Sequence, residues 1–243
     1  MMTTTDQITT QPVPDLTGTT PRTTAYTAFW LFQSAPDRTA ITEQERERIG
    51  ENMVDAIAAS GDEIQLRGAY STAGLSAGVD LILWLVADSC EPFQRLASTI
   101  HRSEAGRMLT MRHVYLGVAS MSQYDPDHGA AFLKGIAPRD YLSVYPFTKT
   151  TDWYLLPYEQ RRDLMIEHGR MGQEFPTILT NTVNSFGIAD QEFIVALEDD
   201  DPATLVKMVQ RLRAAEVRKY TQVDTPIFLG LRTELREAVL GAL

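Results

Sequence analysis

Four side chains with redox or metal-binding chemistry lie close together in the sequence, between residues 145 and 168. Tyr145 and Lys149 belong to the segment Tyr-Pro-Phe-Thr-Lys, Trp153 follows, and His168 lies in Ile-Glu-His-Gly. A phenol can be oxidised, an amine can donate a proton, and a neutral imidazole can bind iron. This combination is typical of a haem site rather than a hydrolytic site, and it indicates oxidative chemistry on or beside a porphyrin.

The imidazole of His168 also has a plain structural interpretation. It shares a helix face with Leu164 and Met171, at i−4 and i+3, so its ring points toward the core side. A buried imidazole must be hydrogen-bonded or metal-bound, so a satisfied structural histidine is the alternative to an axial ligand. Gly169 and Gly172 favour the ligand, because small residues would let a flat macrocycle approach the helix.

The other candidates depend on an extended backbone before this helix. Pro146 forces the preceding residue into an extended conformation. A continuing strand would place Tyr145, Lys149 and Trp153 on one face at even steps. Tyr145 as core and Lys149 as surface are the alternatives, but three such residues on one face point to a site. An axial imidazole usually needs a carboxylate or carbonyl on its other nitrogen, for which Glu216 is the candidate.

The composition is that of a globular protein with no general affinity for polyanions. With 243 residues, 44% of them hydrophobic, the chain can bury one large core or two modest ones. A net charge of −10 argues against nucleic acid or anionic lipid as partners. No apolar run is long enough for a membrane span and no export signal is present, so we expect a cytoplasmic protein. Serine-hydrolase, Walker, zinc-protease and dinucleotide-binding motifs are also absent.

Hydrophobic periodicity predicts a complete structural unit in residues 23–121. The expected strands cover 25–32, 64–70, 81–86 and 113–119, and the expected helices cover 42–59 and 93–108. This βαββαβ order is that of a ferredoxin-like unit. Residues 1–22, which are rich in Thr, Pro and Asp, are expected to be a flexible leader.

The second half of the chain repeats this order at an offset of about 112 residues. Its expected strands cover 153–156, 177–185, 193–197 and 226–229, and its expected helices cover 158–173 and a segment from 205. We therefore expect an α+β fold in which two tandem ferredoxin-like units form a dimeric α+β barrel-type subunit. Residues 145–243 would be the second unit, and residues 122–144 the linker.

The repeat indicates which half carries function, because a residue present in only one copy is not required by the fold. His168 lies on the first helix of the second unit, where the first unit has apolar residues near Met53. His128 lies in the linker, where turn-forming neighbours favour simple solvent exposure. The alternative for His128 is a distal base that takes a proton from hydrogen peroxide and returns it to the departing oxygen.

These residues resemble the chlorite dismutase-like family and, within it, the actinobacterial coproheme decarboxylases. The similarity runs from about Thr23 onward and is carried by Tyr-Pro-Phe-Thr-Lys, Trp-Tyr-Leu-Leu-Pro-x-x-x-Arg-Arg and Glu-His-Gly. It implies two ferredoxin-like units, a haem-type ligand in the second unit and a homopentameric ring. It also implies an oxidoreductase that uses hydrogen peroxide to convert propionates 2 and 4 of iron coproporphyrin III to vinyl groups. The products would be haem b and carbon dioxide, in the coproporphyrin-dependent pathway of haem biosynthesis.

The resemblance implies a role for each main candidate. His168 would be the iron ligand, Tyr145 the residue oxidised to a radical, and Lys149 a proton donor or propionate contact. Trp153 would be a neighbour of the site, and His128 the distal histidine of the actinobacterial branch.

Further positions follow from the same resemblance. Basic and hydroxyl groups near the C-terminus hold the propionates in the family, which matches Arg218 and Thr225, and Arg139 is another basic candidate by position. Chlorite dismutases place an arginine on the strand after the histidine helix, and residues 177–183 contain none, which disfavours chlorite chemistry. Some decarboxylases have glutamine there, and Thr180 or Asn181 would take its place.

Coproheme would thus be both substrate and redox cofactor, with no other metal, and coproporphyrin ferrochelatase would be a transient partner. Two rival functions remain open. A haem-binding protein without chemistry would keep His168 but would not need Tyr145 and Lys149. A peroxidase or chlorite-decomposing enzyme would act on external substrates with protohaem bound.

Overall fold

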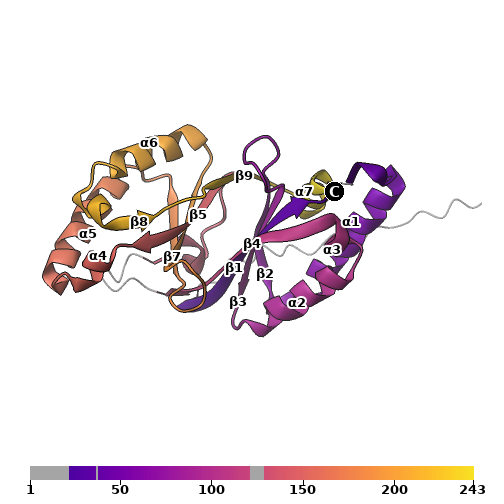
Figure 1. Cartoon of the computed structure of the whole chain (residues 1–243), viewed down its shortest axis with the longest axis horizontal. Coiled ribbons are helices and arrows are strands. Elements are labelled where there is room, and N and C mark those ends of the chain that lie inside the picture. Colours follow the sequence, from indigo (N-terminus) through magenta and orange to yellow (C-terminus); the bar gives the residue numbers. More distant parts are fainter. Residues whose placement is uncertain (1–21, 37, 121–128) are drawn as a thin grey trace, which may run out of the picture.

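A closed ring of β-strands, built from two similar halves, is the frame of the fold (Figure 1). The computed structural model describes residues 22–36, 38–120 and 129–243, and the strands named below lie in these ranges. Their order is β7-β6-β4-β1-β3-β2-β9-β5, and β5 pairs with β7 to close the ring, while β8 joins β5 at its end. The predicted barrel of two tandem units is confirmed.

The first unit has the predicted βαββαβ order. Its elements are β1 (Thr24–Ser34), α1 (Glu43–Ala58), β2 (Gln65–Ser71), β3 (Leu81–Ala87), α2 (Glu91–Arg102), α3 (Ala105–Met108) and β4 (Leu109–Ser120), with short 3-10 helices at Arg38–Ala40 and Gly61–Glu63. Thr42 and Glu45 form a capping box that starts α1. The helix predicted over 93–108 is two helices, because the backbone is extended at Ser103.

The second unit repeats the antiparallel arrangement, with strands in the order β6-β7-β5-β9. Its elements are β5 (Tyr141–Lys149), α4 (Thr151–Leu155), α5 (Tyr158–Gln173), β6 (Leu179–Asn184), β7 (Phe193–Asp199), α6 (Pro202–Leu212), β8 (Thr221–Val223) and β9 (Phe228–Thr233). Two 3-10 helices, Ala131–Lys134 and Glu216–Tyr220, and the helix α7 (Leu235–Ala242) complete the described chain.

The opening strand of this unit is β5, so the strand predicted over 153–156 is wrong. That apolar run belongs mostly to α4, in which Trp153 is buried while Leu155 is 77% exposed. The strand begins at Tyr141, inside the range expected to be a linker. Pro146 fits within β5 because β9 pairs only as far as Val144 and β8 starts to pair at Thr148.

The two halves meet inside the barrel and share one apolar core. Strand β2 pairs with β9, and β4 pairs with β6, so each joint links one unit to the other. The core inside the ring includes Phe29, Trp84, Tyr115, Leu142, Val183, Ile194 and Phe228. Both halves contribute side chains to this core. Neither sheet could bury its inner apolar face alone, which explains why the barrel closes.

The helices lie outside the barrel, at opposite ends of the molecule in Figure 1. Helices α1, α2, α3 and α7 cover the first unit, and α4, α5 and α6 cover the second. The C-terminal helix α7 thus returns to the first unit, where Leu235 and Val239 join its helical core. No helix in the described ranges is both long and apolar enough to cross a membrane.

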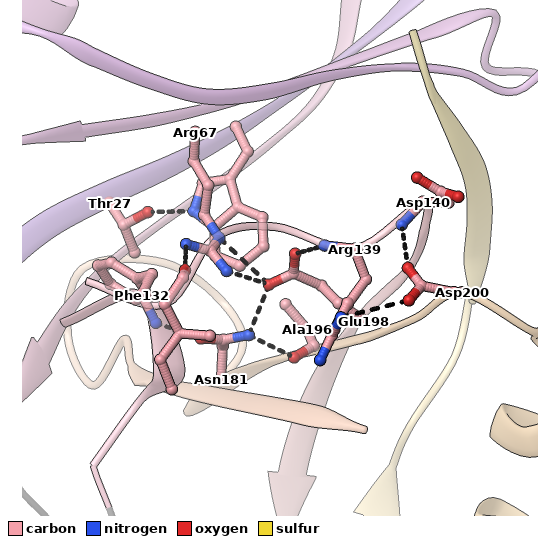
Figure 2. A network of polar contacts seen from close by, with 11 residues as sticks. Thr27, Arg67, Phe132, Arg139, Asp140, Asn181, Ala196, Glu198 and Asp200 are labelled. Carbon is pink, nitrogen blue, oxygen red and sulfur yellow. Dashed lines mark hydrogen bonds and ion pairs between the residues drawn. The ribbon is translucent and has the colours of Figure 1, made fainter. Parts of the chain in front are cut away.

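A buried ion pair joins the two units across the barrel interior (Figure 2). The guanidinium of Arg67 on β2 donates to Oε1 of Glu198 on β7 at 2.7 Å, and both side chains are almost fully buried. Asn181 Nδ2 also donates to this carboxylate, at 3.0 Å, and Asn181 Oδ1 accepts from the backbone N–H of Phe132. Burial raises the pKa of Glu198, and the charge of Arg67 opposes that rise.

Candidate functional site

Helix α5 packs very differently from its counterpart in the first unit. The counterpart α1 has five buried residues facing its sheet: Ile49, Gly50, Met53, Val54 and Ile57. Helix α5 has none, and its inward stripe is only half-buried, comprising Arg161, Leu164, Met165, His168 and Met171. The two units therefore differ between the first helix and the sheet. The inward face of α5 is not fully covered by its own sheet, so a ligand could be held there.

His168 is a neutral imidazole with a free buried nitrogen. Burial, and then the positive charge of Lys149, lower the pKa of His168 from 6.5 to about 4. Its Nδ1 is buried and has no hydrogen-bond partner among the described residues. A buried nitrogen without a partner is costly, and a neutral imidazole is the form that binds iron. The chemistry of this residue fits an axial ligand of a haem-type group.

The structure does not place Glu216 on this imidazole. The Glu216 carboxylate accepts from Lys219 Nζ on the same 3-10 helix, and both side chains are largely exposed. The backbone N–H of Glu216 donates instead to Glu167, at 3.1 Å, next to His168 on α5. The carboxylate of Glu216 thus bonds this lysine and not the imidazole, and its role as the group that orients His168 stays a prediction.

Lys149 and Trp153 form a compact pair at the end of β5. Lys149 Nζ lies 4.4 Å from the centre of the Trp153 ring and 5.2 Å from that of Phe147, so the ammonium rests on aromatic faces. Burial, and then the charge of Arg218, lower the pKa of Lys149 to about 8, while the charge of Glu192 opposes this shift. Lys149 is thus a cation whose charge changes just above neutral pH.

Tyr145 lies on β5, four residues before Lys149, and its side chain is on the outer face of the sheet. It packs with the apolar cluster of Ile178, Leu197, Leu205 and Met208. Burial raises the pKa of Tyr145 to about 12, with smaller effects from Arg213, Asp224 and Arg218. The phenol therefore stays protonated at neutral pH, as a donor of a hydrogen atom must.

Strand β8 brings basic groups to this end of β5. Lys149 is opposite Thr221, and the N–H of Thr150 donates to the carbonyl of Tyr220 at 3.0 Å. The segment that follows α6 is thereby held beside the site with Arg218, whose guanidinium donates to Asp224 at 2.8 Å. Arg213 bonds the same carboxylate. Arg218 is therefore near Lys149, and its role as a propionate contact stays a prediction.

Thr180 and Asn181, although adjacent, lie on opposite faces of β6. Thr180 is opposite Leu197, a member of the outer cluster that Tyr145 joins, so it faces the helices. Asn181 faces the barrel interior and is fully buried in the network of Glu198 (Figure 2). Because side chains alternate along a strand, only one of the two can face the helices, and of the two predicted cofactor contacts Thr180 is the one on that side.

Two further predicted positions, Arg139 and Thr225, do not join the cluster. Arg139 bonds Asp200 at 3.3 Å, and its backbone N–H donates to Glu198, so it belongs to the network of Figure 2 and not to the site. Thr225 is exposed next to Asp224 and makes no side-chain hydrogen bond to the described residues. His128 lies outside the described residues.

Glu192 is a member of the site that the sequence did not reveal. Its Oε2 accepts from the backbone N–H of Lys149 at 2.7 Å and from the hydroxyl of Tyr154 at 2.5 Å. The carboxylate of Glu192, just before β7, thus connects the end of β5 to α4, the helix that contains Tyr154 and Trp153. Glu192 stands just before a predicted strand, and no spacing within the sequence connects it to Lys149.

Known proteins with similar sequences place this chain in a family. The sequence profile of the family described as chlorite dismutase matches residues 46–233. A coproheme decarboxylase of Mycolicibacterium smegmatis is 32% identical over 218 residues, which cover 89% of this chain and 94% of the relative. A coproheme decarboxylase of Staphylococcus saprophyticus is 25% identical over 163 residues, covering 60% of this chain and 65% of the relative.

A solved structure shares the fold. Chlorite dismutase from Candidatus Nitrospira defluvii, in complex with imidazole, superposes with a TM-score of 0.81 at 23% identity, covering 88% of this chain and 93% of that chain. The profile match over most of the chain and the relative at 32% identity establish the assignment: the chain belongs to the chlorite dismutase family.

Proposed function

We propose that this protein is a coproheme decarboxylase, which uses hydrogen peroxide to convert two propionates of iron coproporphyrin III to vinyl groups. The observation that carries the proposal is the cluster on the outer face of the second unit. It contains an oxidisable phenol (Tyr145), a buried cation (Lys149) and a neutral imidazole (His168) whose Nδ1 has no partner among the described residues. Lys149 is close enough to lower the pKa of His168, and the charge of Arg218 acts on both Lys149 and Tyr145. The 32% identical relative bears the same name as the proposed activity.

Each residue has a task that its surroundings support. Coproheme would supply the redox chemistry, since iron porphyrins react with hydrogen peroxide to give strong oxidants. His168 would hold the iron, which requires the neutral form that its pKa of about 4 provides. Tyr145, which stays protonated, would give up a hydrogen atom and then take one from a propionate β-carbon. Loss of carbon dioxide and of one more electron would leave the vinyl group, and one hydrogen peroxide, which is reduced to water, would supply both oxidising equivalents: one through Tyr145 and one for this second electron.

The basic groups would hold the carboxylates and balance their charge. Lys149 carries a positive charge below about pH 8 and is fixed by Trp153, so it can orient a propionate near Tyr145. Arg218 lies close enough to lower the pKa of Lys149 and would bind a second carboxylate. A local basic pocket of this kind allows an acidic protein to bind a tetra-anionic porphyrin. His128 stays our candidate for proton transfer to peroxide.

Chlorite chemistry is the rival that the sequence of β6 disfavours. No arginine occurs between Leu179 and Asn184, and the residues there that face the helices are neutral. A homopentameric ring and a transient contact with coproporphyrin ferrochelatase belong to the proposal as predictions of the resemblance.

Product analysis tests the proposal. The purified chain is loaded with coproheme, titrated with hydrogen peroxide, and its porphyrin is identified by mass. We expect stepwise loss of two carboxyl groups to give haem b. Unchanged coproheme would contradict the proposal, and oxygen release from chlorite by the protohaem-loaded chain would support the rival instead.

A further inference from the structure

One arginine on the inward face of α5, Arg161, pairs with no acidic side chain of the described residues. Arg161 is half-buried, and its Nε is enclosed without a hydrogen-bond partner among the described residues. No ion pair involves its guanidinium in the described part of the chain, whereas Arg213 and Arg218 share the carboxylate of Asp224. The next residue, Arg162, is exposed and bonds Asp163 at 2.9 Å.

An unpaired guanidinium is unusual in such a position. Partial removal of a charge from water costs free energy unless an opposite charge or a set of hydrogen bonds replaces the water. The chain carries 32 acidic residues, so partners are plentiful elsewhere on the surface. The unpaired state of Arg161 therefore points to a partner that comes from outside the chain.

The position of Arg161 on α5 indicates where that partner lies. Arg161 is two helical turns before His168, about 10 Å along the helix, and the two residues share the half-buried stripe with Leu164. If His168 bound the iron, the porphyrin would lie beside α5 and extend along the same face of the helix. Leu164 would then lie over the macrocycle and Arg161 at its rim, where the propionates are attached.

From this placement we infer that Arg161 binds a propionate carboxylate of the porphyrin, through the forked hydrogen bonds that guanidinium groups make to carboxylates. The inference rests on the proposed function and adds to it an anchor on the helix of the iron ligand. Lys149 and Arg218 come from β5 and from the segment after α6, so Arg161 would hold the ring from a third element. A planar fork gives direction as well as charge, and lysine cannot replace it fully.

The test compares Arg161→Gln with Arg162→Gln, which removes the same charge one residue away. Each apo-protein is titrated with iron coproporphyrin III, and binding is followed by quenching of tryptophan fluorescence. We expect Arg161→Gln to bind about 10-fold to 100-fold more weakly than the wild type, and Arg162→Gln to bind within about twofold of it. Arg161→Lys should recover part of the loss. Equal binding by Arg161→Gln and the wild type would overturn the inference.

A second ligand separates carboxylate binding from a role in shape. With the tetramethyl ester of the same iron porphyrin, which has no free carboxylate, the wild type and Arg161→Gln should bind alike. An equal loss for ester and acid would also overturn the inference, because it would mean that the substitution distorts α5. A wild type that binds no coproheme would contradict the proposed function itself, whereas normal wild-type binding with no effect at Arg161 contradicts the inference alone.

Discussion

The ammonium of Lys149 lies 4.4 Å from the centre of the Trp153 ring, although the first belongs to a strand and the second to the helix that follows it. Thr150 is the N-cap of α4, so the helix begins directly after the strand, and its third residue, Trp153, lies against the lysine. The indole excludes water from one side of the ammonium, and this contributes to the lowered pKa of Lys149. The contact with Trp153 therefore affects the charge of Lys149 as well as its position.

This lowered pKa predicts how coproheme binding depends on pH. A lysine is charged below its pKa, so Lys149 loses its charge as the pH rises through about 8. We expect the affinity for coproheme to fall about tenfold between pH 7 and pH 10, with a bound carboxylate moving the midpoint upward. Titrations across this range should show the fall in the wild type and a much flatter profile in Lys149→Met. Identical profiles for the two proteins would remove Lys149 from the binding site.

Glu192 should act on the site through Lys149. Its negative charge raises the pKa of Lys149, against the larger effect of burial. Glu192→Gln removes the charge but keeps an oxygen for the N–H of Lys149, so the pH midpoint of coproheme binding should move to lower pH with little change in fold. Asp190→Asn, an exposed substitution two positions away, is the control and should leave the midpoint unchanged. A midpoint that stays fixed in Glu192→Gln would contradict this role.

His168 should make the apo-protein sensitive to acid. Its folded-state pKa of about 4 lies below the ordinary value of 6.5, so the unfolded chain binds the extra proton between these pH values. The free energy of unfolding should therefore fall as the pH drops from 6.5 to 4, by about 1–3 kcal/mol from this residue. Urea unfolding at both pH values measures it. His168→Gln should lose this dependence, and His101→Gln, which alters an exposed histidine, should keep it.

The buried pair of Arg67 and Glu198 should contribute to closure of the barrel (Figure 2). Glu198→Gln leaves the guanidinium buried without a charged partner, so we expect a loss of about 3–5 kcal/mol in the free energy of unfolding. Asp200→Asn also removes a partner of an arginine, but that pair is exposed, and we expect a loss below about 1 kcal/mol. Denaturant unfolding of both variants compares them, and equal effects would argue against the burial of the pair.

The sequence predicts the repeated frame better than the details of the site. Apolar alternation identifies β1, β3 and β7, because a half-buried or fully buried strand leaves a clear pattern. The run Trp153 to Leu156 is equally apolar, but most of it belongs to the short helix α4. A run of four residues is too short for periodicity to distinguish a helix from a strand. The predicted position of the opening strand was wrong for this reason. The predicted proximity of Trp153 to Lys149 nevertheless agrees with the contact between them.

Positions that depend on long-range contacts could not be read from spacing. Thr180 and Asn181 are adjacent, and nothing in the local sequence shows which of them faces the helices. Only the pairing of β6 with β7 decides this. Glu192 meets Lys149 because β5 and β7 are neighbours, which no local pattern records. His168 was identifiable because the other copy of the unit has apolar residues in its place.

Tyr145 is the residue that we expect to be oxidised during the reaction. The test of this role is the mass of the porphyrin formed from coproheme and hydrogen peroxide by Tyr145→Phe, beside Tyr141→Phe as control. Tyr141 lies on the same strand and packs in the same cluster, so its loss removes an equivalent hydroxyl without touching the proposed chemistry. We predict that Tyr145→Phe binds coproheme but forms haem b at least about 100-fold more slowly, while Tyr141→Phe forms it normally. Normal formation of haem b by Tyr145→Phe would contradict the account.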